Sequence, residues 1–161
     1  MKIHRSAVGI LAALVAALAF TAVAFAANPH FVSGNATINQ NGSLTCSFKI
    51  AGLGNEPQDV TCTATGTFVY QCFNNGGNHP KAGNKETVSA QLSTTQQFQP
   101  HNGQITGSLL LGPSGPGDFS CPSGQTLYLQ SAQYSNIVLS SPGLEDLSLG
   151  STGTVTLHQQ V

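Results

Sequence analysis

The sequence lacks tryptophan and carries very little charge. Of its 161 residues only 7% are charged, with 5 Lys and Arg against 6 Asp and Glu, and the basic side chains form no cluster. Nucleic acids and anionic lipid surfaces are bound through such clusters. We therefore expect neither nucleic acid nor a charged membrane surface as a partner. Serine, threonine, asparagine, glutamine and glycine are abundant instead, so uncharged polar groups must make up the surface.

A catalytic or metal-binding set is also lacking. The few acidic residues show no pair placed to converge on one site, as a glycosidase requires. His30 follows Pro29, which has no backbone N–H to offer a Cu(II) ion near the amino terminus. His101 and His158 have no Cys or carboxylate at a metal-ligand spacing. We expect a protein that is not an enzyme and holds no metal or cofactor.

Only one long apolar run is present, from Ala7 to about Ala27, and it follows a segment with basic residues at positions 2–5. Ala24-Phe25-Ala26 supplies the small residues that signal peptidase requires before the cut. We predict a signal peptide over residues 1–26, cleaved after Ala26 or Ala27; an uncleaved anchor is the alternative. Residues 27–161 are then a single secreted domain, with no membrane association after cleavage because no second run approaches about 20 apolar residues.

The remaining chain has apolar residues with period two, which is typical of half-buried strands, and no sustained helical period. The longest alternation is Val60, Cys62, Ala64, Gly66, Phe68, Tyr70 and Cys72, interleaved mostly with threonine. Leu44, Cys46, Phe48 and Ile50 alternate before it, and the connector of residues 51–57 is rich in turn formers. We predict that these two strands form a hairpin about Gly54.

Further short strands are predicted near residues 31–38, 87–98, 104–111, 126–139, 147–149 and 154–157. The apolar phase changes twice within residues 126–139, which indicates bulges. Seven to eight short strands with regular turns favour an all-β, immunoglobulin-like two-sheet β-sandwich. A small β-barrel is the alternative.

Four cysteines, Cys46, Cys62, Cys72 and Cys121, are an even number in a chain predicted to be exported. Two disulfides with three possible connectivities are the default expectation. The predicted hairpin places Cys46 opposite Cys62, whereas Cys72 lies about 33 Å farther along the same strand, too far for a bond to either. We predict the pairs Cys46–Cys62 and Cys72–Cys121.

The most distinctive segment runs from Tyr70 to Lys85, YQCFNNGGNHPKAGNK, and with Ala51-Gly52-Leu53-Gly54-Asn55 it resembles small exported actinobacterial-type proteins of unknown function. The resemblance implies an exported immunoglobulin-like β-sandwich and transfers no catalytic or binding residue. A loop held by a rigid scaffold is a frequent place for recognition. The candidate recognition residues are Asn75, Asn78, His79, Lys81, Asn84 and Lys85. An ordinary connection with solvated charges is the alternative, and the turn-forming composition favours it.

The leading functional hypothesis is a secreted, non-enzymatic binding or structural protein of the bacterial exterior. Its partner would be a cell-wall or extracellular polysaccharide, a protein or a small molecule. A carbohydrate-binding module is one alternative, although tryptophan is lacking and Tyr70 belongs to the buried face of its strand; Tyr128 and Tyr134 are the candidates for outward aromatic rings. A small-ligand carrier or enzyme inhibitor is the other alternative.

Overall fold

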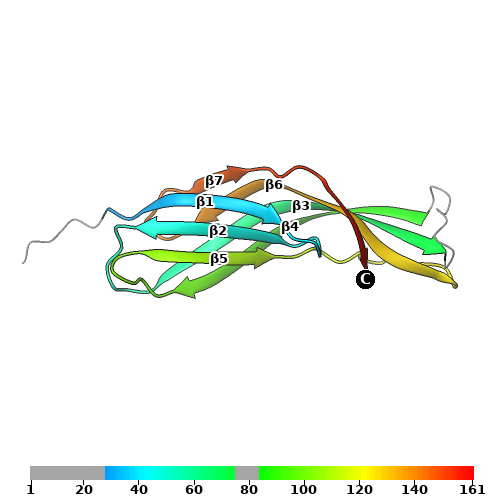
Figure 1. Cartoon of the computed structure of the whole chain (residues 1–161), viewed down its shortest axis with the longest axis horizontal. Helices are drawn as coiled ribbons and strands as arrows, with labels where there is room; N and C mark the ends of the chain where they lie inside the picture. The colour runs from blue at the N-terminus through cyan, green and yellow to red at the C-terminus, as the bar shows by residue number, and fades with distance from the viewer. Residues whose placement is uncertain (1–27, 75–83) are drawn as a thin grey trace, which may run out of the picture.

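The computed structural model describes residues 28–74 and 84–161. They contain eight β-strands in two antiparallel sheets (Figure 1). The three-stranded sheet has the order β1-β2-β5, formed by β1 (His30–Ile38), β2 (Leu44–Ala51) and β5 (Ile105–Leu111). The five-stranded sheet has the order β4-β3-β6-β7, with β8 also paired to β6. Its strands are β3 (Gln58–Asn74), β4 (Lys85–Phe98), β6 (Gln125–Ser140), β7 (Leu147–Gly150) and β8 (Val155–Gln160).

The core lies between the inner faces of the two sheets. Alternate residues of β2 and β3 are buried, and they meet buried residues of β5 and β6 in one apolar cluster. Phe48 and Phe98 pack edge to face inside it, with ring centroids 5.1 Å apart. The predicted immunoglobulin-like two-sheet sandwich is therefore confirmed, and the barrel alternative is wrong because the sheets do not close on each other.

The predicted hairpin about Gly54 is wrong. β2 pairs with β1 and β5, whereas β3 pairs with β4 and β6, so the two strands lie in different sheets. The connector between them crosses from one sheet to the other, and Leu53 within it is anchored by a backbone hydrogen bond from its N–H to the Gly103 carbonyl, at 3.0 Å. Period-two alternation places Cys46 and Cys62 on buried faces, but it does not distinguish strands paired in one ladder from strands packed face to face.

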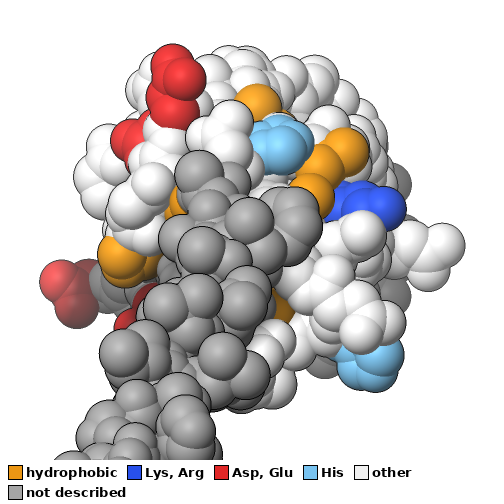
Figure 2. All heavy atoms as spheres, turned by 90° about the vertical axis from the view of Figure 1, so that its left-hand side faces the viewer, with side chains coloured by type: hydrophobic (Ala, Val, Ile, Leu, Met, Phe, Trp, Pro, Cys, Tyr) orange, Lys and Arg blue, Asp and Glu red, His pale blue; other side chains and the backbone are white. Residues whose placement is uncertain are grey.

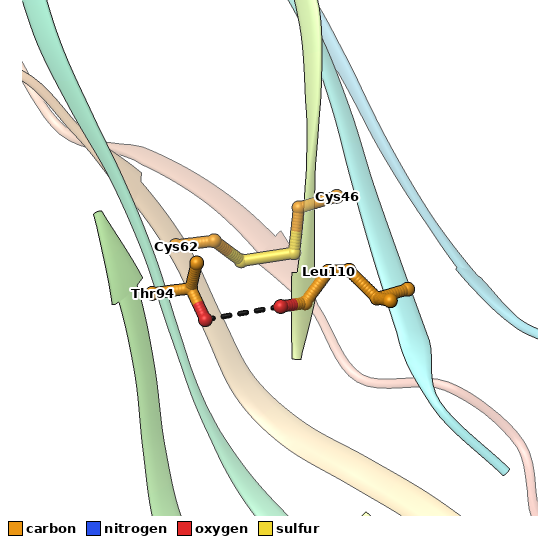
Figure 3. The surroundings of a disulfide bond; sticks show 4 residues. All are labelled: Cys46, Cys62, Thr94 and Leu110. Carbon is orange, nitrogen blue, oxygen red and sulfur yellow. Dashed lines mark hydrogen bonds between the residues drawn. A yellow bond between two sulfur atoms is a disulfide. The ribbon is translucent and has the colours of Figure 1, made fainter. Parts of the chain in front are cut away.

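The predicted disulfide between Cys46 and Cys62 is nevertheless confirmed, and it joins the two sheets (Figure 3). Both cysteines are fully buried, and their Cα atoms are 6.5 Å apart. Close to this disulfide, the Thr94 hydroxyl of β4 donates a hydrogen bond of 3.0 Å to the Leu110 carbonyl of β5. A covalent bond and a polar contact therefore connect the layers through the middle and at one edge.

β3, β4 and β6 extend well beyond the three-stranded sheet (Figure 1). The three-stranded sheet does not cover this extension, and the connector between β5 and β6 packs against β3 there instead. Cys121 in that connector is bonded to Cys72 of β3, with Cα atoms 5.6 Å apart, which confirms the second predicted pair. The buried Tyr70 hydroxyl donates a hydrogen bond to the Ser114 carbonyl in the same connector. The connector is therefore held to the sheet at two points.

β6 contains the two bulges that its phase changes predict. Its register against β3 shifts between Leu129 and Ser131 and again between Ser135 and Val138. Asn136, within the second shift, has a φ of 50°, a left-handed conformation that Asn adopts more readily than most residues. Each bulge inserts one residue, so Leu129, Ala132 and Ile137 all reach the core.

Candidate binding surface

The predicted recognition loop is only partly described by the structure. Asn75, Asn78, His79 and Lys81 lie outside the described residues. Asn84 is partly buried, and its side-chain amide donates a hydrogen bond of 3.0 Å to the Gln125 side chain at the start of β6. Lys85 is exposed and opens β4 opposite Gln71. The described end of this segment is therefore joined to the sheet by Asn84.

The outer face of the five-stranded sheet is a second candidate, called the polar face below. It consists of the odd-numbered residues of β3 from Thr61 to Gln71, the odd-numbered residues of β4 from Thr87 to Thr95, and their outward neighbours on β6, Ser131, Gln133, Ser135, Val138 and Ser140. These positions alternate with the buried residues of β3, so their side chains point away from the core. Val69 and Val138 are its apolar members, and all the others carry a hydroxyl or amide group.

Hydrogen bonds between side chains cross the polar face from strand to strand. The Thr65 hydroxyl accepts bonds from the Gln91 amide of β4, at 2.9 Å, and from the Asn136 amide of β6, at 3.4 Å. Thr61 and Thr95 are directly opposite, and their hydroxyl oxygens are 2.8 Å apart. Threonine also has restricted χ1 rotation. The hydroxyl groups of Thr61, Thr65 and Thr95 are therefore held in place without a ligand.

Charge is confined to the two ends of the polar face. Asp59 lies opposite Gln97 at one end, where the Gln97 amide donates to its carboxylate at 3.3 Å. Lys85 lies opposite Gln71 at the other end. The end of the molecule seen in Figure 2 likewise shows separated acidic, basic and histidine side chains on a mostly uncharged surface. The positions between the two ends form a neutral hydrogen-bonding surface.

The outer face of the three-stranded sheet differs in two respects. It carries a charged side chain, Lys49, in its central strand, opposite Thr106. It also carries Leu110, whose side chain is 58% exposed. This smaller face has serine and threonine as well, including Ser47 and Ser108, which are paired across β2 and β5. It therefore provides a natural comparison for substitutions on the polar face.

An aromatic group lies at the Lys85 end of the polar face. Tyr128 of β6 stacks on His158 of β8, with ring centroids 4.2 Å apart and planes 16° from parallel. Phe73 packs edge-on against both rings, at 5.4 Å from Tyr128 and 5.1 Å from His158. Gln130 contacts the His158 Nδ1 atom at 3.1 Å. Tyr128 is half-buried and His158 exposed, so ring surface is accessible here.

The expectation that Tyr134 could point outward is wrong. Its side chain is fully buried, and its hydroxyl donates a bond of 2.7 Å to the Gly42 carbonyl. The first bulge in β6 moves Tyr134 to the core side of the strand, where it packs edge to face against Phe68 at 5.5 Å. Burial raises the pKa of the Tyr134 phenol, and electrostatic repulsion between its phenolate and that of Tyr70 raises it further. Tyr70 is buried as predicted, and burial raises its pKa too.

Within residues 28–74 and 84–161, no three His, Cys, Asp or Glu side chains gather to hold a metal ion. No helix in the same residues has the length and apolar character to cross a membrane. All four cysteines are bonded in pairs. Persistent disulfides are typical of oxidising compartments, so the chemistry of the chain is compatible with an extracellular protein.

Comparison with known proteins gives no further guide, since neither a protein-family model nor a curated protein matches the chain. The alternation of threonines with buried residues makes the β3 part of the polar face visible in the sequence. The β4 and β6 parts are not visible there, because they depend on pairing between strands distant in the chain, such as Thr65 with Gln91 and Ser135.

Proposed function

We propose that this chain is a secreted, non-enzymatic binding or structural protein of the bacterial exterior. The observation that carries the proposal is the pair of disulfides, one joining the two sheets and one holding the connector between β5 and β6 to β3. Small extracellular domains use such bonds for stability where reductants are absent. The N-terminal apolar run supplies the route of export.

The surface supports the same proposal. Neutral hydroxyl and amide groups cover the polar face, and side-chain bonds hold the hydroxyls of Thr61, Thr65 and Thr95 in place. A rigid scaffold presenting fixed polar groups binds without a large loss of side-chain entropy. Carbohydrate binding is the alternative that this face favours over carriage of a small apolar ligand.

Expression of the full chain in an actinobacterial host tests the proposal. We expect the protein in the medium or cell-wall fraction, beginning at Ala27 or Asn28, with four oxidised cysteines, as measured by intact mass and peptide mapping. A matched chain with Ala24→Leu, Ala26→Leu and Ala27→Leu, which lacks the small residues before either cut, should remain unprocessed. Recovery of the unprocessed wild-type chain in the cytoplasm with free thiols would contradict the proposal.

A further inference from the structure

We propose that the polar face binds a neutral polysaccharide, with the sugar chain lying across β4, β3 and β6 and its end near the Tyr128–His158 stack. The inference rests on the proposed function and adds to it the site and the class of ligand. Four properties of this face support it: its lack of charge, its hydrogen-bonding groups, their pre-organisation and its aromatic end.

The charge of the polar face decides against ionic partners. Between Asp59 and Lys85, three paired strands present no charged side chain outward. Nucleic acid and anionic lipid require Lys or Arg at the contact, and an acidic polymer would lose its hydration without gaining a counter-charge. The partner that fits this surface carries no net charge.

The hydrogen-bonding inventory favours sugars over proteins. Tight protein interfaces are anchored by Trp, Tyr, Arg and other large side chains, whereas serine and threonine are depleted or contribute little there. The apolar side chains on the polar face are Val69 and Val138. A hydroxyl group both donates and accepts, as does a primary amide through its two ends. A polymer of neutral sugars presents hydroxyl groups in a repeating series, so the side chains of each strand can form hydrogen bonds with it.

Pre-organisation makes this surface suitable for binding. Same-side residues of a strand repeat about every 7 Å, and neighbouring strands are about 4.8 Å apart. Thr65 is fixed by Gln91 and Asn136, and Thr61 by Thr95. Because each bond to sugar replaces a bond to water, single contacts are weak. Many contacts along one polymer add up, so affinity should rise with the length of the sugar chain.

The aromatic group supports sugar binding independently of the polar residues. Tyr128 and His158 are stacked at 4.2 Å and lie beside Gln130, while Phe73 supports both rings from the edge. Tyr128 pairs with Gln71, which is the last polar residue of β3 on the polar face. The apolar side of a sugar ring packs on aromatic rings, whereas its hydroxyl edge needs polar partners. Both kinds of contact are available at this end of the face.

The test measures depletion of the oxidised full-length protein from solution by insoluble cellulose and chitin, with polygalacturonate as the charged comparison. The variant Thr63→Glu/Thr67→Glu places two carboxylates in the centre of the polar face. The matched control Thr106→Glu/Ser108→Glu adds the same charge to the outer face of the other sheet. We expect wild type and control to bind a neutral polymer equally, and the polar-face variant to lose about tenfold or more in affinity.

A near-isosteric variant keeps the result interpretable if the charged one folds poorly. Thr63→Val/Thr67→Val removes two hydroxyls while retaining β-branched side chains, and we expect an affinity reduced severalfold with an unchanged unfolding midpoint. Binding of all variants at wild-type strength would overturn the inference, as would retention on polygalacturonate alone or on no polysaccharide. Recovery of a secreted chain bound to a protein partner would overturn the inference while leaving the proposed function in place.

Discussion

Two tyrosines place their hydroxyl groups at the boundary of the apolar interior, and both donate to backbone carbonyls. Tyr134 reaches Gly42 in the turn between β1 and β2, and Tyr70 reaches Ser114 in the connector between β5 and β6. Each bond joins the five-stranded sheet to a segment distant in sequence. Burial disfavours the phenolate, so the pKa of each hydroxyl is raised in the folded protein.

The raised pKa values predict a loss of stability in alkali. A tyrosine in the unfolded chain ionises near pH 10, whereas the two buried phenols of the folded protein stay neutral there. The stability that these phenols contribute to the fold is therefore complete below about pH 10 and is lost as pH rises above it. Tyr134→Phe should lower the free energy of unfolding by about 1 kcal/mol at pH 7, because the Gly42 carbonyl loses its donor. The same variant should show a shallower fall of Tm between about pH 9 and about pH 11. Parallel curves for variant and wild type, measured by circular dichroism, would contradict this.

At the scale of the element, β6 combines strand pairing on both of its sides with two bulges. It pairs with β3 along most of its length and with β7 and β8 on its other side. Its two bulges keep apolar residues inward while the strand twists past both partners. A regular strand of the same sequence with Leu129 inward would turn Ala132 and Tyr134 outward, because a shift of one residue exchanges the faces.

The bulge at Asn136 should therefore be sensitive to the residue type. Asn136→Val puts a β-branched side chain at a φ of 50° and should destabilise the fold by about 1–2 kcal/mol. Asn136→Gly should change stability little, because glycine adopts this φ readily. Ser135→Val, one residue earlier and outside the left-handed region, is the matched control and should be tolerated. Equal urea midpoints for the two valine variants would show that the bulge is not strained by side chains.

At the scale of the whole molecule, the two disulfides act in different parts of the sandwich. Cys46–Cys62 closes 16 residues and joins the sheets in the core, whereas Cys72–Cys121 closes 49 residues and holds the connector over the extension of β3, β4 and β6. Longer loops lose more entropy when they are closed in the unfolded chain. The second bond should therefore contribute more to stability than the first.

Paired replacements test this ordering. Beyond the effect of the cavity that each replacement leaves, Cys72→Ala/Cys121→Ala should lower the free energy of unfolding by about 4 kcal/mol and Cys46→Ala/Cys62→Ala by about 3 kcal/mol. Hydrogen exchange in the first variant should accelerate near Tyr70 and Leu127 while the amides around Phe48 remain protected. Uniform loss of protection across the sandwich would contradict this division into a core and a held extension.

Much of the architecture followed from the sequence alone. Alternation with period two is a property of each strand by itself, so the buried face of β3, the bulges in β6 and the number of strands were readable without partners. For the disulfides, ten residues of extended chain excluded a bond between Cys62 and Cys72, but the choice of Cys62 as the partner of Cys46 rested on the hairpin, which is wrong; the two cysteines meet across the core instead.

Only the tertiary structure decided which strand pairs with which. β2 and β3 have the same alternation whether they form a hairpin or face each other, and packing of both apolar faces selected the second arrangement. Likewise, the bulged register of β6 turned Tyr134 inward and brought Asn136 to Thr65, and the pairing of β4 with β3 brought Gln91 to the same hydroxyl. The polar face therefore exists only after folding, because its three strands are joined by hydrogen bonds between distant segments that local sequence patterns do not specify.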